Sequence, residues 1–249
     1  MGRKVTYVEK TKATVDKGIP VLMYHHLLYD KENKNYRTSS TMDVNLFEQQ
    51  MKYLYDNKNI AITPTDLELF LKGQKNLSTK AVLITFDDGN KSGLVYAEPI
   101  LKKYKLKATN FIITSRVGDK PKEFNPNSLQ FLSKDELVKA STVFNYGSHT
   151  HGLHQTSTNN GKSMVVNSSY NELTKDLKKS KEYVPAKYFA YPFGQYNVTT
   201  LKALKDLDYR LAFTTKNGYV QKGNNPLELN RIAINDSVTI SKFKTIINY

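Results

Sequence analysis

Two adjacent carboxylates follow a strongly apolar stretch of the chain. Residues 81–84 are Ala-Val-Leu-Ile, which is typical of a buried strand, and residues 85–89 continue as Thr-Phe-Asp-Asp-Gly. Neighbouring strand residues point to opposite faces, so Asp87 and Asp88 cannot share one role unless the backbone turns, and Gly89 permits a turn. One carboxylate can then bind a metal ion while the other acts as a base. A simple turn after a strand produces the same pattern about as often.

A histidine cluster lies downstream of the carboxylate pair. Three of the five histidines fall within six positions, at His149, His151 and His154, directly after the run 143–147. A single histidine is usually a hydrogen-bonded core or surface residue, but three together with a carboxylate pair favour a metal site. Two imidazoles and one carboxylate suit zinc, iron or cobalt and leave coordination positions for water and substrate. The chain has no Cys, which excludes a thiolate zinc site.

A second histidine pair closes another apolar run. His25 and His26 follow residues 19–24, which also have the composition of a strand. Because side chains alternate along a strand, we expect His26 to point away from any site that His25 faces. A histidine that caps backbone groups at a strand end remains the alternative for His25.

Strand patterns alternate with helical patterns along the chain. Ser133 and Glu136 form a capping-box pattern before one of the helices. Alternation of this kind predicts a parallel sheet, and polar groups at three strand ends favour an α/β barrel with its site on the C-terminal face. The expected strands are 20–25, 81–86, 109–114, 145–149, 188–191, 210–214 and 229–234. The expected helices are 45–57, 64–72, 94–104, 134–140, 169–182 and 199–207.

Length and composition predict one domain. Barrels of this class often run to the 249 residues found here, and 39% hydrophobic residues are enough for a sizeable core. We expect a polar arm at residues 1–18 and a single domain at 19–249. No run is apolar and long enough to cross a bilayer, and no signal-peptide pattern opens the sequence.

The chain is strongly basic, with 37 Lys and Arg against 23 Asp and Glu and a net charge of +14. The basic residues are spread throughout and no nucleic-acid motif is present, so a nucleic-acid partner is not expected. Diffuse positive charge favours association with an anionic cell surface. A solvated basic surface with no partner is the alternative.

The two motifs together resemble the polysaccharide deacetylases, the NodB-homology family of carbohydrate esterase family four. The resemblance runs from about residue 20 to 234 and implies a distorted (β/α) barrel, with seven parallel strands. It implies that Asp87 is the general base and that Asp88, His149 and His154 hold a divalent metal ion, with zinc first and cobalt, nickel or iron as alternatives. His151 lies inside the second motif, where the family accepts various residues.

The order of the motifs resembles one branch of this family. Residues 22–25, Leu-Met-Tyr-His, match a motif that usually lies near the C-terminus and carries the general acid, whereas here it lies near the start. This order resembles the circularly permuted branch that deacetylates poly-β-1,6-N-acetylglucosamine of biofilms, with His25 as the acid. The resemblance implies a secreted, surface-associated and monomeric hydrolase. Peptidoglycan or chitin-type chains are alternative substrates, and a carbohydrate-binding domain with little turnover is a third reading.

One motif departs from the family pattern. Where the family has Arg-x-Pro-aromatic, residues 190–193 are Ala-Tyr-Pro-Phe, so the Arg that orients the base is missing. We predict that Arg231, on a later strand, reaches the same carboxylate. The chain has no Trp; we expect Tyr191, Pro192 and Phe193 to form a groove wall, and we count Arg231 with them among the substrate-side residues. A rigid turn after a buried strand explains residues 191–193 as well.

Overall fold

The computed structural model describes residues 18–32 and 38–248. The predicted arm at 1–18 therefore lies outside the described residues, apart from Gly18. Among the described residues, no helix is both long and apolar enough to cross a membrane.

Within the described residues, seven parallel strands run along the main sheet, as predicted, and a short eighth strand, Ile60–Ala61, pairs with one of them off this path. Each neighbouring pair on the path β10-β1-β5-β6-β7-β8-β9 is parallel. The sheet curls into a half-barrel, and Leu229, which precedes β10, forms a parallel bridge with Phe213 of β9. These strands are β1 (Val21–Tyr24), β5 (Ala81–Asp88), β6 (Ala108–Ile112), β7 (Phe144–Ser148), β8 (Tyr188–Ala190), β9 (Leu211–Phe213) and β10 (Ile232–Ala233).

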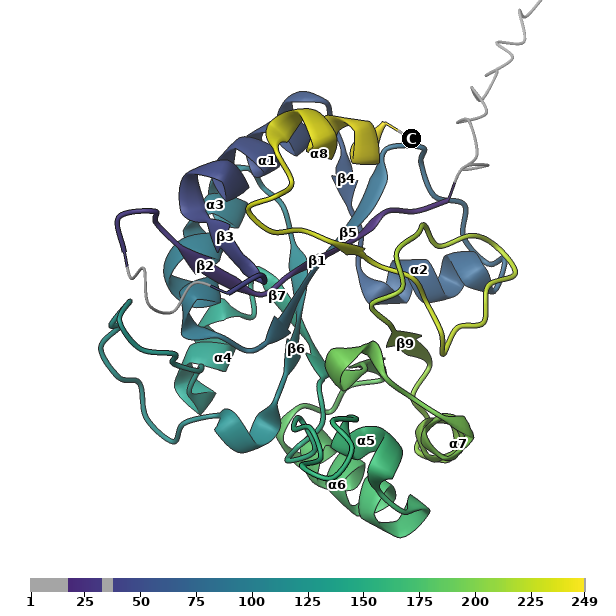
Figure 1. Cartoon of the computed structure of the whole chain (residues 1–249). Helices are drawn as coiled ribbons and strands as arrows, with labels where there is room; N and C mark the ends of the chain where they lie inside the picture. The colour runs from purple at the N-terminus through teal and green to yellow at the C-terminus, as the bar shows by residue number, and fades with distance from the viewer. Residues whose placement is uncertain (1–17, 33–37, 249) are drawn as a thin grey trace, which may run out of the picture.

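Helices surround the strands, which lie in the middle of the molecule (Figure 1). Capping side chains begin several of them, and Ser133 with Glu136 forms the predicted capping box at α4. The helices are α1 (Val44–Asp56), α2 (Pro64–Leu71), α3 (Glu98–Lys103), α4 (Lys134–Ala140), α5 (Met164–Asn167), α6 (Tyr170–Tyr183), α7 (Val198–Asp206) and α8 (Ile240–Ile247). Short helical turns are η1 (Gly93–Ala97), η2 (Thr114–Arg116) and η3 (Pro192–Gly194).

The core divides according to the alternation of the strands. Leu22 and Ile84 belong to a cluster that includes Phe47 of α1, whereas their neighbours Val21 and Leu83 belong to a cluster that includes α2. Both faces of the sheet are therefore buried, which explains why β1 and β5 read as continuous apolar runs. Packing on both faces of the sheet holds the C-terminal ends of these strands in place.

The structure adds elements that the sequence patterns did not reveal. A two-stranded parallel sheet, β2 (His26–Leu28) with β3 (Thr41–Asp43), and the short β4 (Ile60–Ala61) beside β5 are new. So are α5 and α8. The helix predicted at 94–104 is divided into the π-helical turn η1 and α3. Pro99 explains the division, because it has no N–H to continue the regular hydrogen-bond ladder.

Candidate active site and metal centre

The C-terminal ends of three strands bring the predicted chemical groups together. His25 follows β1, Asp87 and Asp88 end β5, and His149 follows β7. β1 and β5 are direct neighbours in the sheet, and β7 lies two strands from β5. Parallel strands deliver their C-terminal residues to one edge of the sheet, which is where α/β proteins of this kind place their sites.

A backbone reversal at the end of β5 separates the two carboxylates. Asp88 has φ of 76° and Gly89 has φ of 76°, both in the left-handed region. The turn thus begins at Asp88 itself, one residue earlier than the sequence pattern indicated, and Asp is one of the few residue types that tolerate this conformation. A side chain at Gly89 would come within 3.0 Å of Ile112, so the position favours glycine on both counts.

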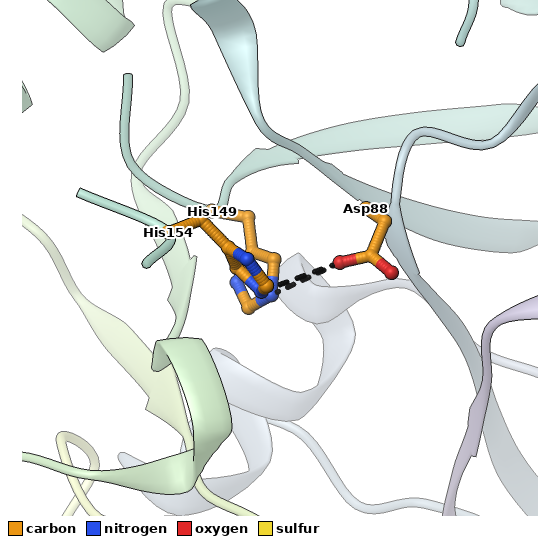
Figure 2. Close-up of side chains that lie close together, drawn as sticks. All are labelled: Asp88, His149 and His154. Atoms are coloured by element: carbon orange, nitrogen blue, oxygen red, sulfur yellow. Dashed lines mark ion pairs between the residues drawn. The ribbon is translucent and has the colours of Figure 1, made fainter. Parts of the chain in front are cut away.

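Asp88, His149 and His154 form a compact candidate ligand set. The Oδ1 atom of Asp88 lies 3.6 Å from Nε2 of His149 and 3.4 Å from Nε2 of His154. Figure 2 shows both imidazole rings facing the carboxylate. One ligand atom from each of the three residues lies within 4.8 Å of the others. This spacing allows all three atoms to contact a single ion.

The chemical state of both histidines suits metal binding. His149 Nδ1 lies 2.7 Å from the carbonyl oxygen of Ala190, so Nδ1 carries the proton and the lone pair of Nε2 faces Asp88. Burial lowers the pKa of His149. Burial, together with the charge that His149 carries only when it is protonated, lowers the pKa of His154 to about 4. Both rings are therefore neutral at neutral pH, which is the form that binds metal.

The donor set fits a divalent ion that also needs open coordination positions. Two imidazole nitrogens and one carboxylate oxygen are three protein ligands, the number typical of catalytic zinc sites. The side chains of Asp88 and His154 are 22% and 15% exposed, so water and substrate can reach the site. Nickel, cobalt and iron accept the same donors.

The loop that carries the two histidines is held by residues that the sequence analysis did not identify. The Asp176 carboxylate of α6 accepts the backbone N–H groups of His151 and Gly152, at 2.8 and 2.7 Å. Thr150, which lies between His149 and His151, adopts a left-handed backbone conformation with φ of 72°. The sequence analysis missed Asp176 because a carboxylate on a distant helix gives no local sequence signal of a contact with this loop. His151 itself faces Thr114, whose hydroxyl lies 3.0 Å from its Nδ1, and it is not part of the ligand set.

Asp87 lies in a different environment, because Arg231, the residue directly before β10, holds it. The guanidinium donates to both carboxylate oxygens at 2.7 Å, and its Nε donates to the Thr214 carbonyl. The predicted contact between Arg231 and Asp87 is therefore present. Burial alone would raise the pKa of Asp87, but Arg231 and the nearby histidines hold that pKa well below its usual range. Arg231 is fully buried, so it is placed to position Asp87 and not to touch a polymer.

His25 lies on the open side of Asp87. Its Nε2 is 3.9 Å from Oδ2 of Asp87, and its side chain is 23% exposed. His26 belongs to β2, and its Nδ1 lies 3.0 Å from the hydroxyl oxygen of Ser92. The two neighbours thus have separate surroundings, as the alternation along the chain predicted.

Only one of the three expected groove-wall residues is exposed. Tyr191 is fully buried and donates to the Leu227 carbonyl, and Pro192 is also buried, so the prediction for these two is corrected. Phe193 is 44% exposed, and its ring lies 4.7 Å from that of His154. Its φ of 57° turns the chain at this point and explains why the ring alone reaches the surface.

Comparison with known proteins agrees with this geometry. Residues 74–212 match the family model described as polysaccharide deacetylase. A poly-β-1,6-N-acetyl-D-glucosamine N-deacetylase of Staphylococcus aureus is 34% identical over 214 residues, which cover 83% of this chain and 70% of that protein. The chain belongs to the polysaccharide deacetylase family. It is accordingly a hydrolase that acts on N-acetyl amide bonds.

Solved structures support the same assignment. The Streptococcus pyogenes deacetylase PplD, in complex with acetate, superposes with a TM-score of 0.79 at 28% identity and covers 94% of this chain and 99% of that one. IcaB from Ammonifex degensii gives a TM-score of 0.79 at 26% identity, with 94% and 98% covered. The matched family segment of this deacetylase contains Asp87 and the three ligand residues, but neither His25 nor Arg231.

Proposed function

We propose that this deacetylase hydrolyses N-acetyl groups from poly-β-1,6-N-acetylglucosamine with the help of a divalent ion, giving acetate and a partly deacetylated, cationic polymer. The observation that carries the proposal is the placement of His25. It precedes the whole matched family segment in sequence, yet its imidazole lies 3.9 Å from Asp87 at the same sheet edge as the ligand set. The similarity to the S. aureus enzyme supports the choice of polymer.

In the proposed reaction, Asp88, His149 and His154 would hold a divalent ion. Bound there, the ion would lower the pKa of a water molecule and polarise the acetyl carbonyl. Asp87, kept ionised by Arg231, accepts a proton at its carboxylate. Arg231 fixes both carboxylate oxygens, so the acceptor atom is oriented before substrate arrives.

His25 has the complementary task at the leaving group. An amine departs poorly unless it is protonated, and an imidazole can donate a proton near neutral pH. The side chain of His25 is 23% exposed whereas that of Asp87 is 3% exposed, so His25 is the group accessible from the open side. We assign Phe193 the support of a sugar ring, because its ring is exposed and lies beside that of His154.

Several finer assignments belong to this proposal. Zinc is the first candidate for the ion, because the three ligands match catalytic zinc sites. We also propose one catalytic domain over 19–249 after an arm at 1–18, a monomeric state, and a secreted protein that associates with an anionic cell surface. The net charge of +14 supports surface association.

The two alternatives from the sequence analysis differ in what they require of the site. A β-1,4-linked substrate such as peptidoglycan or chitin uses the same chemistry and differs only in how the polymer is seated. A binding domain with little turnover drew its main support from the Arg missing at Ala190. That support weakens, because Arg231 contacts Asp87 through two hydrogen bonds of 2.7 Å.

Acetate release from matched oligomers tests the proposal. Metal-stripped enzyme, with zinc, cobalt or nickel added back, is assayed on β-1,6-linked and β-1,4-linked N-acetylglucosamine oligomers of equal length. We expect metal-dependent release from the β-1,6 oligomer. Release from the β-1,4 oligomer alone would move the assignment to cell-wall or chitin-type chains, and metal binding without any release would favour the binding domain.

A further inference from the structure

A basic cavity lies beside the turn that carries the two catalytic-site carboxylates. It has a volume of about 340 Å³, and its lining comes from Lys91 and from the segment 116–131. The basic side chains of Arg116, Lys120 and Lys122 line it, together with the ring of Phe131. No acidic side chain is among the lining residues.

Backbone hydrogen bonds connect this cavity to the site. The carbonyl of Gly89 accepts from the N–H of Leu132 at 3.0 Å, and the N–H of Lys91 donates to the carbonyl of Gln130 at 2.8 Å. On the other side, the N–H of Ser115 donates to the carbonyl of His151 at 3.1 Å. The cavity is therefore attached both to the turn after Asp88 and to the loop that carries the histidines.

The charges in the cavity are only partly compensated. Lys91 is buried, and its ammonium lies 2.7 Å from Oε1 of Glu136, which cancels its charge. The segment 116–131 contains two carboxylates: Asp119 lies 3.0 Å from the ammonium of Lys134, and Glu123 does not line the cavity.

Among the described residues, three cations of the cavity have no carboxylate partner. Within the described part of the chain, Arg116, Lys120 and Lys122 form no ion pair. Arg116 is also held in place, since its guanidinium carbon lies 4.8 Å from the centre of the Phe131 ring. A fixed guanidinium and two ammonium groups around one concave space form a recognition site for an anion.

We propose that this cavity binds an anionic group, a phosphate or a carboxylate, carried by the sugar polymer close to the residue being deacetylated. The inference rests on the proposed function, because it names a further feature of the same substrate. A neutral homopolymer leaves the three cations without a partner, whereas a polymer with anionic substituents pairs with them. The enzyme therefore prefers stretches of polymer that bear such a substituent.

Three matched substrates test this inference: a neutral β-1,6-linked N-acetylglucosamine tetramer, the same tetramer with one phosphate monoester, and the same tetramer with one carboxymethyl group. The kcat/KM of the zinc-loaded enzyme is measured on each. We expect a preference of about ten-fold for at least one charged tetramer, since each charge-assisted contact contributes modestly at an exposed site. Comparison of the two charged tetramers shows whether the cavity prefers a phosphate or a carboxylate.

Charge-neutral variants supply the decisive comparison. In Lys120→Ala/Lys122→Ala and in Arg116→Gln, the ratio of charged to neutral kcat/KM should fall to within about two-fold. Lys139→Ala on α4 removes the same charge from an exposed position outside the cavity and should keep the wild-type ratio. Salt should weaken the preference, because exposed charges are screened.

Equal kcat/KM for all three tetramers in the wild type would overturn the inference, as would a preference that survives in the double variant. If none of the tetramers releases acetate, the proposed function is wrong, whether or not the cavity binds an anion. Calorimetric binding of the same three tetramers then still tests the cavity, and equal affinity for charged and neutral tetramers would overturn it.

Discussion

Asp87 and Asp88 are neighbours in the chain but belong to two regions with different construction. The region of Asp87 is formed by strands: the side chain is 3% exposed and is fixed by Arg231, which directly precedes β10. The region of Asp88 is formed by loops: its carboxylate is 22% exposed and faces two histidines from a segment held by Asp176. In the proposed mechanism, the positive φ of Asp88 separates two chemically identical groups, one for proton transfer and one for metal binding.

The largest effect is expected from Asp88→Ala, which removes a ligand from the loop-built region. Metal binding should be lost, and acetate release should fall by at least about 10³-fold, since the nucleophile depends on the ion. Calorimetry with zinc and an acetate assay measure both quantities. Asp119→Ala, at an exposed carboxylate outside the site, should change neither. Retained zinc affinity in Asp88→Ala would show that Asp88 is not a metal ligand.

Asp87→Asn should separate the two regions. The variant removes the proton acceptor but leaves the three ligands untouched, so zinc should bind with wild-type affinity while acetate release falls by about 10²–10⁴-fold. The same calorimetric and acetate measurements apply. A variant that loses zinc together with activity would show that the two carboxylates form one ligand set.

Arg231→Met should disturb the strand-built region alone. The buried Asp87 carboxylate then has no cation beside it, so the free energy of unfolding should fall by about 3–5 kcal/mol. Acetate release should fall by about 10²-fold, because the carboxylate is no longer oriented. Chemical denaturation and activity of the folded fraction measure the two effects. Arg231→Lys keeps the charge but loses the paired hydrogen bonds and should lie in between; full activity in Arg231→Met would contradict the positioning role.

His25→Gln should affect only the departure of the amine. Hydrolysis of the N-acetyl substrate should fall by about 10²-fold with zinc binding unchanged. An acetyl ester of an acidic phenol has a leaving group that needs no proton, so its hydrolysis should fall much less. Equal losses on the amide and the ester would exclude His25 as the acid.

The smallest effect concerns the pH dependence of the metal-free enzyme. The folded protein lowers the pKa of His154 to about 4, whereas an unfolded histidine titrates near about 6.5. Between these values the unfolded state binds more protons, so this contribution to stability is present above about pH 6.5 and is lost as the pH falls towards 4. Thermal unfolding should therefore shift to lower temperature over this window, and His154→Gln should flatten the shift. An unchanged slope would contradict the lowered pKa.

Much of the architecture was visible in the sequence because it is encoded locally. The seven strands of the half-barrel carry apolar runs or alternation, and α4 begins with its own capping box. The elements that were missed are short or depend on partners. α8 packs Phe243 against Tyr53 of α1, and β4 has two residues beside β5. No local sequence pattern indicates such contacts.

The part of the site that depends on residue types and on the ends of the predicted strands could be predicted from the sequence. The contact of Arg231 with Asp87 followed from the gap at Ala190 and from the closure of the strands. The burial of Tyr191 did not follow, because it is set by packing among α6, α7 and the neighbouring strands. Asp176 and the Ala190 carbonyl were also missed, since each acts through a backbone contact distant in sequence.

We propose that the Asp88 region holds an ion and that the Asp87 region accepts a proton beside it. Titration of zinc into metal-stripped enzyme, with acetate release from the β-1,6 oligomer followed at each step, tests this division of roles. We predict that the rate rises in proportion to zinc and saturates at one ion per chain. Full acetate release by the stripped enzyme, or zinc binding at that stoichiometry with no gain in rate, would contradict the account.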